Sequence, residues 1–541
     1  MHSLVSKVMA FASATALLLL PASPVLANGH EYYPTKTPIK HLVVVFQENI
    51  SFDHYFGTYP SATNPAGEPQ FHARKGTPTV NGLSGALLNN NPNSLNSGNG
   101  AGATNPFRLD RSQAATADQN HSYGPEQAAV DFGLMDLFPK SVGTSGPPPN
   151  APPIADTKGL TMGYYDGNTV TALWNYAQHF AMSDNSFDTE FGPSSPGAID
   201  LVSGQTNGTA EVLNGTTYET DGGDGTLTLV GDADPIGDVC SAPTRNQVQM
   251  SGKNIGDLLT AAGVTWGGFM GGFDLTATNS NGTTGCNRSS TSAYTGTTAD
   301  YIPHHAFFQY YASTANPTHA RPASPTEIGH KGQANHDYDL SDFYAAVKSG
   351  NFPAVSFLKA IAIQDGHAGY SNPLDEQTFI VNLVNFLEKT PEWSSTAVVI
   401  LYDDSDGWYD HQMGPIVNQS TSPADALTGA GQCGNGSTAL PGVDPGNEHA
   451  QGRCGYGPRQ PLMVISPWAR ENFVDHTVTD QTSVIHFIED NWLGGKRIGA
   501  GSFDALSNSI EQMFDFDHCR MDDPLFLDPT TGEPVQEHRG W

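Results

Sequence analysis

Two apolar runs, residues 42–46 and 397–402, constrain the fold more than any other feature of this chain. Uninterrupted apolar stretches of this length are typical of β-strands buried on both faces, as in a parallel sheet. Further candidate strands cover residues 264–270, 354–358 and 462–465, and they are separated by helical patterns such as 339–350 and 373–390. The alternation predicts an α/β fold: an open, mostly parallel sheet flanked by helices, with ligands bound beyond the carboxyl ends of the strands.

Acidic and amide residues follow the first two strands at the points where they end. Glu48 and Asn49 come after one run, and Asp403 and Asp404 after the other. Carboxylates crowded at adjacent strand ends repel one another and have raised pKa values unless a cation lies between them. An all-oxygen set suits a hard divalent ion, so we expect one metal ion, with Ca²⁺, Mg²⁺ or Mn²⁺ allowed and Zn²⁺ less natural. The segment 403–407, DDSDG, is equally compatible with a solvated turn.

A pair of serines precedes a third apolar segment, in the stretch FGPSSPGAIDLVSG (residues 191–204). Either Ser194 or Ser195 could cap a helix running from about residue 196 towards residue 203, because serine is favoured at the cap and proline at the first helical position. A helix N-terminus also attracts anions such as phosphate, which a serine hydroxyl could attack. Taken alone, the fragment favours capping, since caps are common and nucleophiles are rare.

Four histidines are candidates for chemistry. His367 follows the candidate strand at 354–358, which places it at the expected ligand edge of the sheet. His121 and the neighbouring pair His304 and His305 have no spacing argument of their own. A lone histidine is more often structural than catalytic.

The first 27 residues have the pattern of a secretory signal peptide. One lysine, Lys7, precedes an apolar run at 8–20 and small residues that end at Ala27, where we expect cleavage. The run is too short to span a membrane, and no later segment is long enough, so we expect a secreted or periplasmic protein without a transmembrane segment.

The charge balance is strongly acidic, with 55 acidic and 24 basic residues and a net charge of −31. Loss of Lys7 with the signal peptide changes this value to −32. Such a field repels a polyanionic backbone, so we expect no nucleic-acid partner.

Glycine and proline gather in four stretches that read as loop-like insertions, near residues 60–105, 205–247, 276–299 and 418–457. We expect these insertions to decorate one domain that spans residues 28–541. Five cysteines in an exported chain favour disulfides. Cys433 and Cys454 lie in one insertion and form a candidate pair, Cys240 and Cys286 form a second, and Cys519 would stay free, although the sequence does not fix the pairing.

Five motifs follow one another in order along residues 39–492: FQENISFDHYFGTYP, NHSYGPEQAAVDFGLMD, GPSSPGAIDLVSGQ, YIPHH and YDDSDGWYDH. Together they resemble the secreted bacterial acid phosphatase and phospholipase C family, a branch of the alkaline-phosphatase-like superfamily. The Ser-Pro-Gly form of the serine motif and the His-His pair look more like the acid phosphatase branch. Phospholipase C members more often have Thr-x-Pro-Asn-Arg there, where this chain has Gly197 and Ala198.

The resemblance implies specific roles for these residues. Ser194 is implied to be the nucleophile, and Ser195 is then the helix cap. One metal ion is implied to be bound by Glu48, Asn49, Ser194, Asp403 and Asp404. The implied surroundings of the phosphoryl group, which donate hydrogen bonds and protonate the leaving oxygen, are His121, His304, His305 and His367.

The resulting prediction is a secreted, metal-dependent acid phosphatase that hydrolyses small phosphate esters through a phosphoserine intermediate. A metal would lower the pKa of the serine hydroxyl, and cationic histidines would favour mildly acidic pH. A phospholipase C that cleaves phospholipid head groups shares every proposed residue, so the motifs do not separate the two. A non-catalytic exported binding protein braced by a metal is the remaining alternative, because bound Ca²⁺ is often structural.

Overall fold

The computed structural model describes residues 34–146, 151–223, 225–436 and 450–535. The predicted signal peptide, residues 1–27, lies outside them, as does part of the insertion at 418–457. None of the helices in these ranges is long and apolar enough to cross a membrane.

The central sheet has nine strands and confirms the predicted α/β fold. The order is β13-β10-β14-β1-β15-β16-β4-β17, with β18 pairing with β4. All neighbours are parallel except β16, which runs antiparallel to both β15 and β4. The bounds are β1 His41–Gln47, β4 Ala181–Phe187, β10 Trp266–Met270, β13 Asp337–Asp339, β14 Val355–Lys359, β15 Thr396–Tyr402, β16 Arg459–Ile465, β17 Phe473–Asp475 and β18 Thr479–Asp480.

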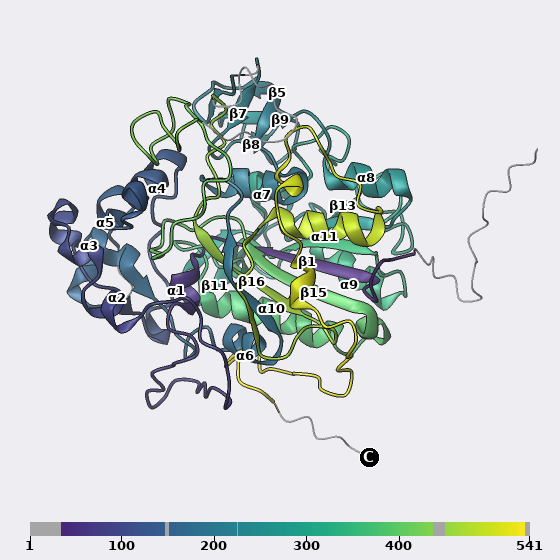
Figure 1. Ribbon diagram of the computed structural model, residues 1–541. Helices are drawn as coiled ribbons and strands as arrows, with labels where there is room; N and C mark the ends of the chain where they lie inside the picture. Colours follow the sequence, from purple (N-terminus) through teal and green to yellow (C-terminus); the bar gives the residue numbers. More distant parts are fainter. Residues whose placement is uncertain (1–33, 147–150, 224, 437–449, 536–541) are drawn as a thin grey trace, which may run out of the picture.

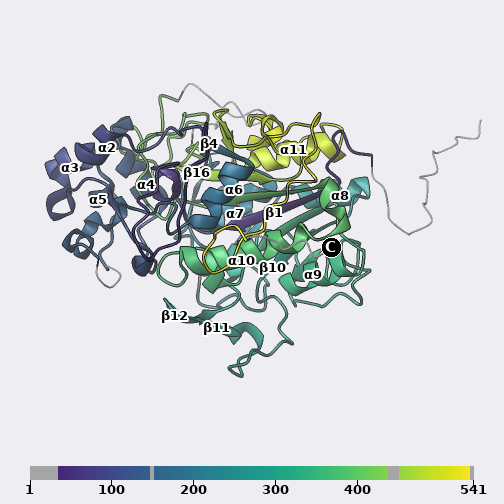
Figure 2. The same cartoon turned by 90° about the horizontal axis from the view of Figure 1, so that it is seen from below.

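Helices cover both faces of this sheet, with α7 and α11 on one side and α9 and α10 on the other (Figures 1 and 2). The patterns at 339–350 and 373–390 form α9 and α10 as expected, each started by a capping side chain, Asp339 and Asn372. The helices around the sheet are α1 Phe52–Phe56, α6 Thr171–His179, α7 Ser194–Ser203, α8 Ile255–Ala262, α9 Leu340–Lys348, α10 Pro373–Leu387 and α11 Thr482–Trp492.

All five candidate strands are present, and their apolar side chains form the core. Every residue of β15 is buried, and β1 is buried from its second residue onward. The two strands pair so that Val43 of β1 lies opposite Val398 of β15. β10 begins two residues later than expected. The strand predicted at 462–465 starts earlier, at Arg459, and is the antiparallel member of the sheet.

The predicted insertions carry secondary structure of their own. Residues 205–247 build most of a five-stranded sheet, ordered β6-β7-β5-β9-β8, at the top of Figure 1. Residues 60–105 hold α2 and α3, which lie beside α4 and α5 in Figures 1 and 2. Residues 276–299 end in the hairpin β11–β12. That the chain folds as a single domain stays a prediction. The bounds are α2 Gly85–Asn89, α3 Pro92–Leu95, α4 Tyr123–Val130, α5 Phe138–Ser141, β2 Phe107–Arg108, β3 Gly163–Tyr164, β5 Asn207–Leu213, β6 Glu219–Asp221, β7 Leu227–Leu229, β8 Asp234–Pro235, β9 Gln247–Met250, β11 Ser289–Ser292 and β12 Gly296–Ala299.

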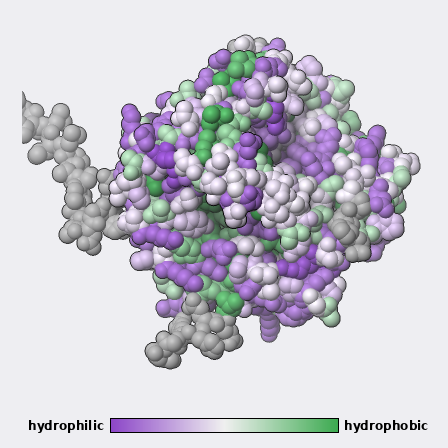
Figure 3. All heavy atoms as spheres, turned by 180° about the vertical axis from the view of Figure 1, so that it is seen from behind, coloured by the Kyte–Doolittle hydropathy of each residue, from purple (hydrophilic) through white to green (hydrophobic). Residues whose placement is uncertain are grey.

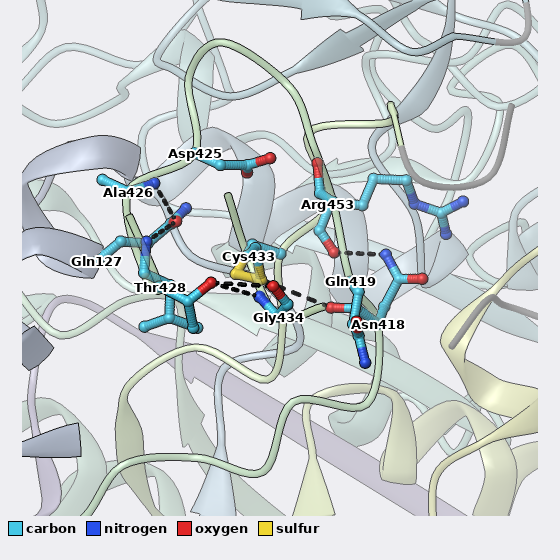
Figure 4. The surroundings of a disulfide bond; sticks show 12 residues. Gln127, Asn418, Gln419, Asp425, Ala426, Thr428, Cys433, Gly434 and Arg453 are labelled. Carbon is cyan, nitrogen blue, oxygen red and sulfur yellow. Dashed lines mark hydrogen bonds between the residues drawn. A yellow bond between two sulfur atoms is a disulfide. The ribbon is translucent and has the colours of Figure 1, made fainter. Parts of the chain in front are cut away.

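Two disulfides fix the insertions, and both candidate pairings are confirmed. Cys433 bonds to Cys454 and Cys240 to Cys286, and Cys519 is free and exposed. Around the first bond (Figure 4), the side chain of Gln127 in α4 accepts a hydrogen bond from the backbone N–H of Ala426 at 2.8 Å. Tyr123 of α4 donates to Asp425 at 2.6 Å and accepts from the Cys454 N–H at 3.0 Å. The insertion at 418–457 is therefore held onto α4.

The surface shown in Figure 3 is mostly hydrophilic, with hydrophobic residues in small scattered groups. This agrees with the excess of acidic residues in the sequence.

A buried carboxyl group joins α10 to the sheet. Tyr55 and Tyr402 donate hydrogen bonds to the two carboxyl oxygens of Glu376, at 3.0 and 2.8 Å. Burial raises the pKa of Glu376 from 4.5 to about 8, although hydrogen bonds from the tyrosines oppose the shift. Because the folded pKa lies above the unfolded one, the contribution of Glu376 to stability is complete below about pH 4.5 and is lost as the pH rises through about 8.

We therefore predict that Glu376→Gln becomes progressively more stable than the wild type as the pH is raised from about 5 to about 8. Melting temperatures measured across this range check it. Glu211→Gln, a substitution of an exposed residue of β5, is the control and should show no such divergence. A constant difference between Glu376→Gln and the wild type at all pH values would contradict the assignment.

Candidate active site

Three neighbouring strands deliver the polar residues to one edge of the sheet. β1 pairs in parallel with β14 on one side and with β15 on the other. Their carboxyl ends therefore place Lys359, Glu48 with Asn49, and Asp403 with Asp404 side by side. The two acidic pairs, which are far apart in the sequence, meet as the strand pattern predicts.

The serine pair starts α7, one residue after a proline cap. The N-cap is Pro193, and the helix begins at Ser194, two residues earlier than expected. The prediction that Ser195 caps the helix is therefore wrong. The hydroxyl of Ser195 accepts a hydrogen bond from Tyr310 at 3.1 Å instead, while the carboxylate of Asp232 accepts from its backbone N–H at 3.0 Å. The physical reason is that Asp232, from a distant loop, satisfies the helix N–H that a cap would have used.

Ser194 lies between the two acidic pairs. Its hydroxyl is 3.1 Å from Glu48 Oε2 and 3.1 Å from Asp404 Oδ2, both acceptors in reach of the single hydroxyl proton. All three side chains are buried. The hydroxyl is thus held against oxygen ligands of the kind that bind a divalent cation.

Close packing of α7 against the end of β15 sets this position. A Cβ atom on Gly197 would lie 2.2 Å from the carbonyl oxygen of Asp403. Only glycine allows this approach, because no side chain tolerates backbone atoms at that distance. The residue that follows the Ser-Ser-Pro segment therefore determines how near Ser194 comes to the carboxylates.

The remaining predicted ligands carry buried polar atoms without partners. The Asn49 N–H donates to Asp403 Oδ1 at 3.1 Å, with Asn49 in a left-handed conformation at φ 46°. Among the described residues, Asp403 Oδ2 and both atoms of the Asn49 side-chain amide have no hydrogen-bond partner. Buried polar atoms of this kind normally bind a partner, so the unpaired oxygens fit a cation.

Sequence reasoning missed a cation that belongs to the chain itself. The ammonium of Lys359, the last residue of β14, pairs with Glu48 Oε1 and lies 3.9 Å from Asp403 Oδ2. Burial would lower the pKa of Lys359, but Glu48 and Asp403 hold it above its ordinary value. Its position directly after the candidate strand at 354–358 was the available signal, by the same argument that selected Glu48.

The charges of the carboxylates follow from this arrangement. Burial and the neighbouring Glu48 raise the pKa of Asp403 to about 7, although Lys359 opposes the shift. Burial also raises the pKa of Asp404 well above its ordinary value, with His121 opposing. For Glu48 burial acts in the same direction, but Lys359 and further partners outweigh it and lower the pKa. The expectation that crowded carboxylates have raised pKa values thus holds for the aspartates and not for Glu48.

The histidines form two groups around the carboxylates. His305 Nδ1 lies 2.9 Å from Glu48 Oε1, and burial lowers the pKa of His305 well below its ordinary value. The rings of His304 and His305 are 4.5 Å apart, and His304 Nδ1 is 3.6 Å from Asp234 Oδ1. His305 therefore contacts a predicted metal ligand directly, and His304 does so only through its neighbour.

The second group joins His121 to His367. Their ring centroids are 5.9 Å apart. His121 Nδ1 is 2.9 Å from the Gln119 carbonyl oxygen and 3.2 Å from Asp406 Oδ1. Although burial acts to lower the pKa of His121, Asp404 and Asp406 raise it well above its ordinary value. Asp406, in the DDSDG motif, is a second residue that sequence reasoning missed.

Two of the side-chain groups able to hold a metal ion contain residues of the predicted site. In each group the possible ligand atoms lie within 4.8 Å of one another. The chemistry of these donor sets fits a divalent ion, without fixing its identity or the number of ions. The two groups are Glu48, His305 and Asp365, and Asp118, His121, His367 and Asp406.

A cavity of about 580 Å³ opens beside the site. Its wall includes His121 and Pro193, the residue before Ser194, and also Tyr218 and Arg245 from the insertion at 205–247. It is large enough to hold a small organic ligand.

Comparison with known proteins places the chain among the hydrolases of phosphoric ester bonds. The Phosphoesterase family model matches residues 39–493, so the chain belongs to the phosphoesterase family. It is 26% identical over 497 residues to phospholipase C A of Mycobacterium tuberculosis, covering 88% of this chain and 78% of the relative. It is 25% identical over 500 residues to a non-hemolytic phospholipase C of Pseudomonas aeruginosa, covering 89% of this chain and 56% of the relative.

Two solved structures are similar at a low level. Murine ectonucleotide pyrophosphatase/phosphodiesterase 5 is 13% identical with a TM-score of 0.29, covering 64% of this chain and 95% of its own. A protein in the alkaline phosphatase superfamily from Vibrio parahaemolyticus is 10% identical with a TM-score of 0.26, covering 83% of each chain. Scores this low add nothing to the fold, which rests on the order and direction of the strands.

We predict that Gly197→Ala moves Ser194 away from Glu48 and Asp404, because the added methyl group meets the Asp403 carbonyl. Overpacking of this kind costs about 1–3 kcal/mol of stability. A displacement of about 1 Å at a reacting atom lowers kcat by roughly 100-fold. Steady-state kinetics and thermal unfolding check both effects. Gly85→Ala in α2, where no atom lies within 4 Å of the added Cβ, should leave kcat unchanged. A Gly197→Ala variant with wild-type kcat would refute this packing argument.

Proposed function

We propose that this phosphoesterase is a metal-dependent phospholipase C that uses Ser194 as its nucleophile. The single observation that supports it best is the hydroxyl of Ser194, held 3.1 Å from Glu48 and 3.1 Å from Asp404 at the N-terminus of α7. The phospholipid substrate follows from the relatives, which are named phospholipases C and match most of this chain.

In the proposed reaction the Ser194 oxygen bonds to phosphorus as the bond from phosphorus to the leaving oxygen breaks. The hydroxyl proton passes to a carboxylate oxygen, for which Glu48 Oε2 and Asp404 Oδ2 are in reach. The leaving oxygen takes up a proton. The intermediate is a serine phosphodiester that keeps the head group, or a phosphoserine when the substrate is a monoester. Water then attacks its phosphorus as the bond to the Ser194 oxygen breaks, a proton returns to that oxygen, and the phosphorylated product is released.

His121 and His367 are the proposed donors to the phosphoryl and leaving oxygens. In both rings Nδ1 is engaged with a backbone carbonyl, of Gln119 and of Ala368 respectively. Nε2 is therefore the nitrogen of each ring that can face substrate. His305 contacts Glu48 instead, which suits it to orienting that carboxylate.

A divalent ion would be held by Glu48, Asn49, Asp403 and Asp404 together with Ser194. When bound, it would supply Lewis-acid stabilisation of negative charge and favour the serine alkoxide. Lys359 neutralises part of the carboxylate charge, so the chain itself supplies one positive charge at the site. His305 and Asp365, which also lie near Glu48, are further candidate ligands.

An acid phosphatase acting on small phosphomonoesters is the second candidate. It is favoured by the Ser-Pro-Gly form of the serine motif and by the cavity of about 580 Å³, which can enclose a small ester.

For either function we also propose export to the cell exterior or periplasm, since two disulfides suit an oxidising compartment.

We predict that Ser194→Ala lowers kcat by roughly 1,000-fold or more and abolishes the covalent adduct on this serine, which is phosphocholine from phosphatidylcholine and phosphate from a monoester. Rapid quenching followed by mass spectrometry of the peptide that carries Ser194 and Ser195 detects that intermediate. Ser195→Ala is the matched control, since this equally buried neighbour contacts Tyr310 rather than the carboxylates, and it should keep most of the activity.

Assays of the wild type, Ser194→Ala and Ser195→Ala on phosphatidylcholine vesicles and on p-nitrophenyl phosphate separate the two substrate classes. Phosphocholine release that depends on Ser194 supports the phospholipase. Turnover of the monoester alone supports the acid phosphatase. Retention of both activities in Ser194→Ala would exclude Ser194 as the nucleophile.

We predict that dialysis against a chelator removes a tightly bound divalent ion, abolishes hydrolysis and lowers the melting temperature, because a ligand that binds only the folded state stabilises it. Metal analysis gives the number of ions per chain. Refilling with Ca²⁺, Mg²⁺, Mn²⁺ or Zn²⁺ singly identifies the ion that restores both properties. Asn49→Ala should weaken metal uptake at this site. Full activity in metal-free protein would overturn the metal dependence.

A further inference from the structure

The most exposed large apolar residues of the described chain gather in one region. Leu95 is 73% exposed, and Phe132 and Leu134 are each 61% exposed. Outside this region the next value is the 56% of Val239. A single exposed apolar side chain is ordinary, but three of the highest values in one place mark a surface that contacts something apolar.

Hydrogen bonds tie these residues together. Leu95 ends α3, and the neighbouring Asn96 donates to the side chain of Asp136 at 2.9 Å. Asn93, also in α3, donates to the Met135 carbonyl at 2.8 Å. The turn between α4 and α5, which holds Phe132 and Leu134, is thus fastened to α3. Figures 1 and 2 both show α3, α4 and α5 grouped at one side of the molecule.

The turn is also held in a costly conformation. Asp131, Phe132 and Met135 all have positive φ, at 44°, 57° and 52°. Residues other than glycine rarely adopt this region, and a bulky residue such as phenylalanine is an outlier there. The turn keeps its shape because Val130, Met135 and Phe138 are buried in the cluster beneath it. The packing beneath the turn therefore offsets the conformational cost of a turn that leaves Phe132 and Leu134 exposed.

Charges of both signs border the apolar residues. Asp131 and Asp136 lie on the turn, and Lys140 is close enough to influence the charge of Asp131. Lys158 donates to the carbonyl of Lys140 at 3.4 Å. Paired acidic and basic groups complement a headgroup layer that carries both phosphate and ammonium. The net charge of the chain, −31, disfavours a purely anionic layer.

Helix α4 connects the turn to the cavity wall. Residues 118–124 line the cavity, and α4 begins at Tyr123 and ends at the turn, a span of about 12 Å. A membrane bound at the turn would therefore lie one short helix away from His121.

We propose that Leu95, Phe132 and Leu134 form a docking surface, the α3–α5 apolar surface, that inserts into zwitterionic phospholipid layers. This inference rests on the proposed phospholipase activity, since it supplies the means by which a water-exposed enzyme reaches lipid.

The test uses the full chain and vesicles of pure phosphatidylcholine. In the double variant Phe132→Asn/Leu134→Ser, the asparagine suits the left-handed conformation and should preserve folding, which an unchanged melting temperature verifies. We expect its sedimentation with vesicles to weaken by roughly tenfold or more, since two large side chains lose their burial in lipid. Hydrolysis of vesicle lipid should fall in parallel, and hydrolysis of the water-soluble phosphodiester p-nitrophenyl phosphocholine should not change. Val239→Ser, which removes an exposed apolar residue elsewhere, should bind like the wild type.

Three outcomes would overturn the surface: wild-type protein that does not bind phosphatidylcholine vesicles, a double variant that binds them as well as the wild type, or a wild-type dimer that the double variant abolishes. The last outcome would assign the surface to a second copy of the chain. Ser194→Ala distinguishes this proposal from the enzymatic one, because it should bind vesicles normally while hydrolysing nothing. Vesicle binding that depends on Phe132 and Leu134, in a protein without lipid hydrolysis, would leave the surface in place and remove the phospholipase assignment.

Discussion

Electrostatic repulsion among buried carboxylates is the constraint on which the candidate site depends. Glu48, Asp403 and Asp404 are all buried at the carboxyl edge of the sheet, where like charges destabilise one another strongly. Lys359 neutralises part of this charge and His305 pairs with the same carboxylate. The compensation is incomplete, because Asp403 Oδ2 has no hydrogen-bond partner among the described residues and Lys359 approaches it only to 3.9 Å. A site that remains short of positive charge is suited to a cation and, through it, to a phosphate ester.

The position of Ser194 follows from packing rather than from electrostatics. α7 reaches the end of β15 because Gly197 lets its backbone touch the carbonyl of Asp403. The carboxylate of Asp232 accepts a hydrogen bond from one of the free N–H groups at the start of the helix, that of Ser195. Pro193, the N-cap, has no N–H group that needs a partner. The hydroxyl at the first helical position is left free to face the carboxylates. The two serine hydroxyls, one residue apart in the chain, thus enter different environments: that of Ser194 faces the carboxylates and that of Ser195 contacts Tyr310.

The insertions shape what reaches this edge. The insertion at 205–247 contributes Tyr218 and Arg245 to the cavity wall, and the disulfide-closed insertion at 418–457 braces α4 through Gln127 and Tyr123. The helices at 85–141 carry the α3–α5 apolar surface at the far end of α4. The carboxyl edge of the sheet is therefore surrounded by insertions that can differ between relatives, since loops tolerate sequence variation that a buried sheet does not.

The sequence by itself determined the sheet, its buried strands and the carboxylates at their ends, because buried parallel strands require continuous apolar runs and such runs are visible in one dimension. It also indicated both disulfides, from the placement of the cysteines in insertions of a chain that we expect to be exported. Only the tertiary structure decided that β16 runs antiparallel, that α7 starts at Ser194 with Pro193 as its N-cap, and that Lys359, Asp232 and Asp406 join the site. Each of these depends on which distant segments become neighbours. A lysine at a strand end or an aspartate in a loop has no distinguishing local pattern until the fold supplies its partner.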